Sequence, residues 1–366
     1  MKKLLIFHPT IAPYRIDFFN DLNEAFDTRI CLQYWNLRDQ HFDYQKIYDQ
    51  FKFIPVYLPD GSKLKQWQSV ISQIREFKPD VVMTCEYGIT TLLAIMIRGL
   101  VGHRFKIVVG TDDSYDMVND GNDFTKRHRI ARNLMAMRVD EIVVISPKVE
   151  KWYIERFKKG IYFPIIVNED FAVRRYERLL PKSREYVKQY GLEGKKVLLS
   201  VSRLVELKNL RRVIDAFEKI SSEAIFVIVG DGPERENLLE QAKHSGKEIV
   251  IAGRFDGDEL YAWYNLASAF VLASYKEAFG AVTNEALLAG CRVIVSKRAG
   301  SSCLVDDNNG ELIDPVNIDE IALAIDRQIQ IADAPNLYLP RKSLMSMSYN
   351  AMMGQLLDKF SHICDS

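Results

Sequence analysis

The feature that most constrains the fold is an alternation of short, uninterrupted apolar runs with segments of helical periodicity. Runs such as Val81–Thr84, Ile107–Val109 and Val197–Val201 contain little polar alternation. Strands of this kind are covered on both faces, which is typical of parallel sheets. Short strands that alternate with helices predict βαβ units. The sequence therefore predicts an α/β protein built from doubly wound parallel sheets.

The alternation occurs twice, and a length of 366 residues agrees with two domains of roughly 150 residues each. In the first half we expect strands at Lys3–Phe7, Arg29–Tyr34, Phe53–Val56, Val81–Thr84, Ile107–Val109 and Glu141–Ile145, and helices at Tyr14–Ala25, Leu64–Phe77, Thr90–Gly99, Phe124–Met137 and Pro147–Phe157. In the second half we expect strands at Val197–Val201, Ile225–Val229, Ile249–Ala252, Ala269–Leu272 and Arg292–Val295, and helices at Asn209–Ile220, with Asn209 as N-cap, and Leu344–Phe360.

The rhythm changes near Pro164, where a segment rich in Arg, Lys and Glu begins. We therefore predict an N-terminal domain over 1–168, a C-terminal domain over 169–342 with a linker at 169–194, and a final helical segment over 343–366. Ligands bind beyond the carboxyl ends of the strands in such sheets. This predicts a site in the cleft between the two domains.

Composition excludes several classes of protein. Lys and Arg number 49, and Asp and Glu also number 49, which argues against a general nucleic-acid binder. None of the five cysteines forms a C-x-x-C pair, so neither a zinc site nor a disulfide framework is indicated. The apolar run before His8 is too short for a signal peptide, and Thr90–Ile97 is too short to span a bilayer. We expect a cytoplasmic protein.

The most informative stretch is Ser274–Leu287, which follows a buried strand and opens a helix. If Glu277 lies in the loop and Glu285 one turn into the helix, both can face the cleft. Glu285 can then accept hydrogen bonds from both hydroxyls of a ribose. The helix start carries partial positive charge and suits a phosphate; its residues are Phe279, Gly280 and Ala281. The alternative is two solvated glutamates flanking a helix cap.

Two cations follow the strand predicted at Val197–Val201. Arg203 offers a planar fork for phosphate oxygens, and Lys208 offers a mobile point charge. Together they can neutralise a departing diphosphate without a metal, although solvated cations are the alternative. Because no D-x-D motif stands at a convincing strand end, we expect no required metal or other cofactor.

Two glycine-containing turns follow the next strands. Gly230 opens a tight turn in which a proline begins a helix, and it can also allow a ligand to approach the backbone. In the second turn, Arg254 and Phe255 can border or stack on a nucleobase. The alternative for the first turn is pure turn chemistry.

Taken in this order, these motifs resemble the second domain of retaining glycosyltransferases of family 4. The resemblance runs from Val197 to about Pro315. It rests on Ser202-Arg203-Leu204 with Lys208-Asn209, Gly230-Asp231-Gly232-Pro233, Gly253-Arg254, the block from Glu277 to Glu285, Ala299-Gly300 and Asn309-Gly310. It implies the GT-B fold, in which two tandem Rossmann-like domains face a central cleft.

The resemblance also implies a function. The donor would be a UDP- or GDP-linked sugar, and the acceptor a hydroxyl of a glycan or lipid-linked saccharide in bacterial surface polysaccharide assembly. Arg203 and Lys208 would hold the diphosphate, Glu285 the ribose and Glu277 the transferred sugar, and the C-terminal helix would cross back to the first domain. A sugar-nucleotide epimerase or hydrolase, or a non-catalytic nucleotide-binding protein, remains an alternative.

The first domain resembles the family less closely. Where the family often has a Gly-rich loop after the first strand, this chain has Pro13-Tyr14-Arg15, so we expect Tyr14 and Arg15 to shape the acceptor side. Many members carry a His near the end of the fifth predicted strand, and this chain has Asp112 and Asp113 there.

We expect Asp112 to act in catalysis by orienting an acceptor hydroxyl or contacting the sugar. We place Asp113 and Glu86 on the acceptor side. The alternative for the two aspartates is a hydrogen-bonded Asx turn.

Residues 123–160 are markedly basic, with ten Lys or Arg against five Asp or Glu, and Trp152, Tyr153 and Phe157 are interleaved with them. Such a surface can dock on anionic lipid and hold the site near a lipid-linked acceptor at the inner face of the cell membrane. The alternative is a set of ordinary solvated helix faces.

Overall fold

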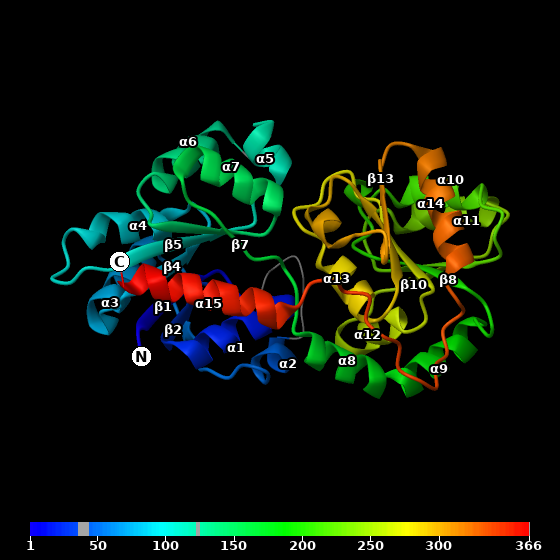
Figure 1. Ribbon diagram of the computed structural model, residues 1–366, viewed down its shortest axis with the longest axis horizontal. Helices are drawn as coiled ribbons and strands as arrows, with labels where there is room; N and C mark the ends of the chain where they lie inside the picture. The colour runs from blue at the N-terminus through cyan, green and yellow to red at the C-terminus, as the bar shows by residue number, and fades with distance from the viewer. Residues whose placement is uncertain (36–43, 122–124, 366) are drawn as a thin grey trace. The chain divides into compact units, whose positions relative to one another are not determined.

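The structure is a computed structural model that describes residues 1–35, 44–121 and 125–365. The chain forms two compact units (Figure 1). Unit 1 comprises Met1–Val167 together with Tyr349–Ser366, and unit 2 comprises Asn168–Ser348. None of the helices in the described residues has the length and apolar character that crossing a membrane requires.

Unit 1 is built on a seven-stranded parallel sheet of order β3-β2-β1-β4-β5-β6-β7. The strands are β1 (Lys3–His8), β2 (Asp27–Leu32), β3 (Val56–Tyr57), β4 (Val81–Cys85), β5 (Lys106–Thr111), β6 (Glu141–Val144) and β7 (Ile161–Tyr162). Leu5, Ile107 and Val109 are fully buried, as expected for strands covered on both faces. The third strand is shorter than predicted and begins only at Val56.

The helical segments of unit 1 cover both faces of this sheet (Figure 1). They are the 3₁₀ helix η1 (Pro13–Arg15) and the helices α1 (Ile16–Ala25), α2 (Tyr44–Tyr48), α3 (Lys63–Phe77), α4 (Ile89–Arg98), α5 (Tyr115–Asn119), α6 (Lys126–Ala136), α7 (Pro147–Phe157) and α15 (Tyr349–Asp365). Trp152 and Tyr153 of α7, expected on a basic surface, lie in the hydrophobic core instead.

The C-terminal helix α15 belongs to unit 1 and lies beside α1 (Figure 1). The Tyr349 hydroxyl donates to Asp21 at 2.8 Å, and the rings of Phe360 and Phe26 are 6.2 Å apart. The helix starts five residues later than predicted, because Leu344 is held in unit 2 by a hydrogen bond from its N–H to the Leu287 carbonyl at 2.8 Å.

Unit 2 is built on a six-stranded parallel sheet of order β10-β9-β8-β11-β12-β13. The strands are β8 (Val197–Val201), β9 (Ile225–Val229), β10 (Ile249–Gly253), β11 (Ala269–Leu272), β12 (Arg292–Ser296) and β13 (Gly310–Ile313). The helical segments are α8 (Glu169–Arg178), α9 (Leu180–Tyr190), η2 (Glu206–Lys208), α10 (Leu210–Glu218), α11 (Arg235–His244), α12 (Gly257–Tyr264), α13 (Ala281–Leu288), η3 (Gly300–Leu304) and α14 (Ile318–Ile331).

The segment expected as a linker, residues 169–194, contains the helices α8 and α9 of unit 2. Several of their charged residues, such as Arg174, Glu177 and Arg178, are exposed, while Tyr176 and Tyr186 are buried against residues of α12. A helix with one polar face can have the amino-acid composition of a linker. Composition alone therefore did not separate this segment from a linker.

Asn209 occupies the N-cap position of α10, as predicted. Asn209 precedes α10 with a left-handed backbone of φ 59°, and its side chain does not cap the helix. Its amide instead donates to the carbonyls of Ala273 at 3.0 Å and Pro315 at 2.7 Å. Asn209 thereby ties together three loops at the carboxyl edge of the sheet.

Candidate functional site

In unit 2, the structure brings Lys208 and Glu277 together as an ion pair, with each side chain 17% exposed. Lys208 ends η2, and Glu277 lies in the loop between β11 and α13. The two loops are joined by a backbone hydrogen bond from Tyr275 to Leu207 of 3.0 Å. A cation and a carboxylate that are 69 residues apart in sequence therefore meet at the carboxyl edge of the sheet.

The start of α13 lies next to this pair and depends on a glycine. Gly280 has φ 94°, and a Cβ there would lie 2.6 Å from Leu272 and 3.2 Å from the Glu277 side chain. Ala281 begins the helix, whose first N–H groups carry partial positive charge. Phe279, predicted as a donor contact, is buried in the domain and packs there as a core residue.

Glu285 lies one turn into α13, as predicted, but its carboxylate is buried. It accepts hydrogen bonds from the hydroxyls of Tyr261 at 3.2 Å and Tyr264 at 2.7 Å. Burial raises the pKa of Glu285, and the two tyrosine hydrogen bonds act in the opposite direction. The tyrosines were missed, although their spacing of three residues on one helix was a readable signal.

The remaining predicted donor residues of unit 2 surround this edge. Arg203 lies in the loop after β8 with an exposed side chain and is not part of the Lys208–Glu277 pair. Arg254 forms an ion pair with Asp256 at 3.0 Å. The Phe255 ring packs 5.5 Å from Trp263, within an aromatic cluster of unit 2.

Gly230 has a structural role at the end of β9. A Cβ at this position would lie 1.8 Å from the carbonyl oxygen of Ser202. The N–H of Ser202 in turn donates to the Val229 carbonyl at 3.1 Å, so the two loops cross in contact. Close packing of loop against loop explains this glycine without a ligand.

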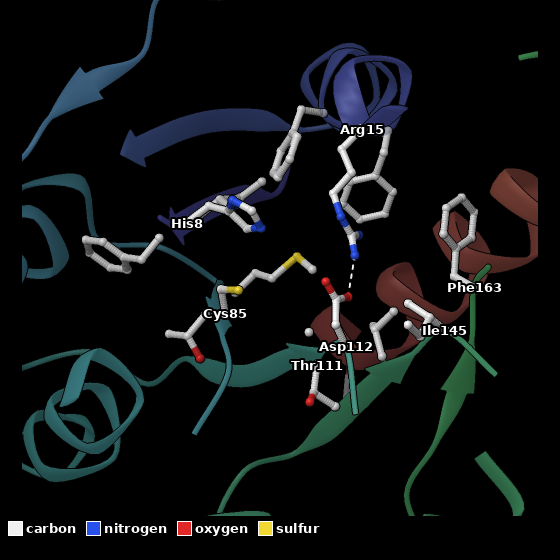
Figure 2. A pocket seen from close by; sticks show the side chains of 15 residues that line it. His8, Arg15, Cys85, Thr111, Asp112, Ile145 and Phe163 are labelled. Carbon is white, nitrogen blue, oxygen red and sulfur yellow. Dashed lines mark hydrogen bonds and ion pairs between the residues drawn. The ribbon is translucent and has the colours of Figure 1, made fainter. Parts of the chain in front are cut away.

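In unit 1, a pocket lies at the carboxyl ends of β1, β4 and β5 (Figure 2). Arg15 extends into it from η1 and forms an ion pair with Asp112, which follows β5. The Arg15 side chain is 17% exposed and that of Asp112 is 48% exposed, so the carboxylate stays open to solvent. Phe163 and Ile145 lie on one side of this pair, and His8 and Cys85 lie on the other.

His8, the last residue of β1, lies in the pocket wall. Its Nδ1 lies 2.6 Å from the Thr10 carbonyl, which fixes Nδ1 as the protonated nitrogen and leaves Nε2 as an acceptor. Burial, together with the charge of Arg15, lowers the pKa of His8 to about 4. His8 is therefore neutral at neutral pH.

The two adjacent aspartates have opposite environments. Asp113 is 1% exposed, accepts a hydrogen bond from the Tyr153 hydroxyl at 2.5 Å and lies 3.8 Å from the equally buried Arg132. Its carboxylate thus lies in the interior, while that of Asp112 lies at the pocket. No local sequence pattern predicts the Asp113–Arg132 contact, because its members lie on separate elements.

Two other predicted residues stand near the pocket. Tyr14 is half-buried in η1, beside Arg15. Glu86, which follows β4, accepts hydrogen bonds from the Asp112 N–H at 2.9 Å and the Thr111 hydroxyl at 3.0 Å. Glu86 thus contacts the loop that carries Asp112.

Comparison with known proteins matches the second unit to one family. Residues 182–340 match the family described as glycosyl transferases group 1. An N-acetyl-alpha-D-glucosaminyl L-malate synthase of Bacillus anthracis is 35% identical over 260 residues, which cover 69% of this chain and 64% of that protein. An alpha-1,4-N-acetyl-D-galactosaminyltransferase of Campylobacter jejuni is 26% identical over 290 residues, covering 78% and 74%. Across three curated relatives, the chain spans 36% to 64% of the relative's length.

The solved structure of Anabaena HepE in complex with UDP superposes with a TM-score of 0.76 and 17% identity, over 99% of this chain and 100% of that one. The chain has the GT-B fold. The GT-B architecture accounts for the two parallel sheets of seven and six strands. The prediction of an α/β protein with two doubly wound sheets is confirmed.

The loop crossing at Gly230 predicts a large effect of a single methyl group. Gly230→Ala should lower the free energy of unfolding by at least about 3 kcal/mol, since the Cβ overlaps the Ser202 carbonyl. Gly253→Ala is the control, because at φ 88° it carries only the left-handed penalty of about 1–2 kcal/mol and its Cβ meets nothing within 4 Å. Urea denaturation measures both; equal losses would contradict the crossing.

The environment of His8 predicts an acid-dependent loss of stability. Its pKa of about 4 in the folded protein lies below its ordinary 6.5, so the unfolded chain binds more protons between these values. The His8 contribution is thus complete above pH 6.5 and is lost as the pH falls toward 4, with a slope of up to about 1.4 kcal/mol per pH unit. His8→Gln should make acid destabilisation shallower over this range, and His244→Gln, which removes an exposed histidine, is the matched control.

Proposed function

We propose that this protein is a retaining glycosyltransferase of family 4. It transfers a sugar from a UDP- or GDP-linked donor to a hydroxyl of a glycan or lipid-linked saccharide, in bacterial surface polysaccharide assembly. The observation that carries the proposal is the Lys208–Glu277 pair beside the start of α13, at the carboxyl edge of a parallel sheet. The match of residues 182–340 to glycosyl transferases group 1 supports it.

In the proposed reaction, the bond between the anomeric carbon and the diphosphate oxygen breaks, and its electron pair stays on the diphosphate. Lys208, Arg203 and the N-terminal end of α13 meet this negative charge. Preorganised charges of this kind contribute roughly 3–4 kcal/mol each to lowering the barrier. Glu277 accepts hydrogen bonds from hydroxyls of the transferred sugar and keeps Lys208 in position before the donor binds.

The acceptor hydroxyl attacks the anomeric carbon from the face that the diphosphate leaves, so the configuration is retained. Its proton passes to an oxygen of the departing diphosphate, which balances the step without a protein nucleophile. Arg15 and the exposed carboxylate of Asp112 bind and orient the acceptor, and Tyr14 borders them. Asp113, buried against Tyr153, supports the loop rather than contacting the acceptor.

Glu285 is proposed to contact the donor ribose through the acceptor sites that its tyrosine hydrogen bonds leave unused. A carboxylate oxygen offers two lone-pair directions, and each oxygen of Glu285 accepts one tyrosine hydroxyl. Structures of Anabaena HepE described as holding UDP and UDP-glucose make uridine donors the first to test.

The proposal predicts that Lys208→Ala and Glu277→Ala each lower kcat/KM for transfer by about 100- to 1,000-fold, because each removes a group held at the leaving diphosphate or the sugar. The measurement is release of the nucleoside diphosphate with and without acceptor. Lys297→Ala is the matched control: it removes a lysine of the same unit that pairs with Glu320 at 2.7 Å and is 54% exposed.

Wild-type turnover in the Lys208 or Glu277 variant would contradict these roles. The acceptor-free arm discriminates against the alternative enzymes. If free sugar accumulates without acceptor as fast as acceptor is glycosylated, the protein is better described as a hydrolase. If an epimer accumulates at that rate, an epimerase is favoured.

We further propose that unit 1 contacts anionic lipid, through a different surface from the predicted aromatic one. Large apolar side chains are exposed on the neighbouring helices α4 and α6. They are three or four residues apart, so on each helix they form one apolar stripe. They are Ile89, Leu92 and Met96 on α4, and Ile130 and Leu134 on α6. Exposed cations on α6, among them Lys126, Arg127 and Arg129, flank the stripe. Apolar insertion together with cationic attraction is the pattern of peripheral membrane binding.

This surface predicts that Met96→Gln combined with Leu134→Gln lowers partition onto vesicles containing anionic lipid by about tenfold or more, since each buried side chain contributes about 1.5–3 kcal/mol. Co-sedimentation measures the partition. Leu323→Gln, which changes a leucine of unit 2 that is 58% exposed, is the control. Equal, negligible binding with and without anionic lipid in the wild type would end the proposal.

A further inference from the structure

Glu86 has an uncommon backbone conformation. Among the described residues, four other than glycine have a positive φ: Lys78, Glu86, Lys158 and Asn209. Lys78 and Lys158 are the C-caps of helices, where this conformation is common, and asparagine tolerates it well. Glu86, at φ 61°, has neither explanation. Strain of this kind persists where the surrounding structure over-determines a residue, and it clusters at functional sites.

The surroundings of Glu86 hold its backbone firmly. Its N–H donates to the Gly110 carbonyl at 2.8 Å, and its carbonyl accepts the Thr91 hydroxyl at 2.6 Å. The Thr91 hydroxyl also lies 2.8 Å from that of Thr84 in β4. Contacts from β5 and α4 therefore fix this one residue.

The fixed backbone aims the Glu86 carboxylate at the loop after β5. One oxygen accepts the Asp112 N–H at 2.9 Å, and the other accepts the Thr111 hydroxyl at 3.0 Å. The Thr111 hydroxyl in turn accepts the Asp113 N–H at 3.2 Å. One carboxylate thus contacts two consecutive residues directly and is linked to a third through the Thr111 hydroxyl.

The central residue of these three, Asp112, carries the carboxylate that pairs with Arg15 in the pocket of unit 1 (Figure 2). Arg15 and Asp112 line that pocket, and Glu86 is not among its lining residues. Glu86 therefore stands behind the pocket, and its carboxylate contacts the lining residues Thr111 and Asp112.

We propose that Glu86 is a positioning residue for acceptor binding, and that its ionised carboxylate holds the 111–113 loop so that Asp112 and Arg15 are correctly placed toward the acceptor. The inference rests on the proposed function. It assigns Glu86 a role through Asp112 rather than direct contact with the acceptor.

Ionisation of Glu86 controls this role near neutral pH. Burial, followed by the charge of Asp113, raises the pKa of Glu86 to about 7, while the hydrogen bonds from Asp112 and Thr111 oppose the shift. The ionisable groups around Glu86 are Cys85 and Tyr87 on its own segment, Asp112 and Asp113 after β5, Arg15 on η1, and Arg132 and Tyr153, which contact Asp113 from α6 and α7.

Only the ionised carboxylate accepts a hydrogen bond on both oxygens without presenting a proton of its own. Acceptor binding should therefore strengthen as the pH rises through about 7. Stability should change in the opposite direction. A folded pKa near 7 lies above the ordinary value of 4.5, so the folded protein binds more protons between these values. The Glu86 contribution to the free energy of unfolding therefore falls as the pH rises from 4.5 to 7.

The experiment compares Glu86→Gln with Glu141→Gln. Glutamine keeps the size of Glu86 but can accept through only one atom. Glu141 is a matched control: it belongs to the same sheet, accepts the N–H groups of Gly160 at 2.6 Å and Ile142 at 3.0 Å, and has a pKa raised by burial, but it stands at the amino end of β6. KM and kcat are measured for donor and acceptor separately between pH 5.5 and 9, together with the melting temperature.

For Glu86→Gln we expect kcat/KM for the acceptor to fall by about 10- to 100-fold at pH 8, because a small displacement of the acceptor suffices for such a loss. The rise of acceptor kcat/KM through pH 7 should disappear, while the donor KM stays unchanged. The difference in melting temperature, variant minus wild type, should be more positive at pH 8 than at pH 5.5. Glu141→Gln should retain the wild-type pH profile of transfer.

An unchanged acceptor profile in Glu86→Gln would overturn the proposal, as would an equal loss in both variants. A crystal structure of Glu86→Gln supplies a readout that needs no activity. If that structure shows residues 111–113 and Arg15 in their original positions, the proposal for Glu86 is overturned. This holds even if the wild type transfers no sugar at all. Absence of transfer by the wild type, with the loop displaced in the variant, would count against the proposed function alone.

Discussion

Burial of parallel strands on both faces is the constraint on which the rest of this structure depends. Every backbone group of such a strand pairs with a neighbour, and the interior on either side accepts apolar side chains almost exclusively. Strands such as β5 and β8 thus have no room for catalytic groups within the sheet. Charged groups that could bind a ligand therefore lie mostly outside the strands, and the parallel arrangement gathers the loops after the carboxyl ends at one edge of each sheet.

The two units use this edge in the same way. In each, a 3₁₀ helix follows the first strand of the unit and carries a cation: Arg15 on η1 after β1, and Lys208 on η2 after β8. Each cation pairs with a carboxylate from a later loop, Asp112 in unit 1 and Glu277 in unit 2. Pairing keeps both charges stable while the site is empty, and a bound anion or hydroxyl can then share the same groups. The proposed donor and acceptor sites are therefore built on one plan.

Behind each pair, buried residues set the geometry. Asn209 ties three loops of unit 2 together through its amide, and Glu86 fixes the loop of unit 1 that carries Asp112. Gly230 lets two backbone segments approach where any side chain would collide, and Gly280 leaves room for the side chains of Leu272 and Glu277. Residues of this kind determine the geometry of the site more strictly than the exposed charges do, because the surrounding packing permits only one conformation of each.

The sequence by itself determined the α/β class and the order of most strands and helices. These follow from local patterns. Apolar runs predict buried strands, and the glycine at position 280 indicates where a helix begins. Only the tertiary structure decided that Phe279 is a core residue, that Trp152 and Tyr153 lie inside, that residues 169–194 include two packed helices, and that Asp112 faces the pocket while Asp113 faces Arg132. The physical reason is that adjacent residues of one loop have similar local preferences. Partners from distant elements, such as Tyr153 and Arg132, then determine which side chain is buried and which remains exposed.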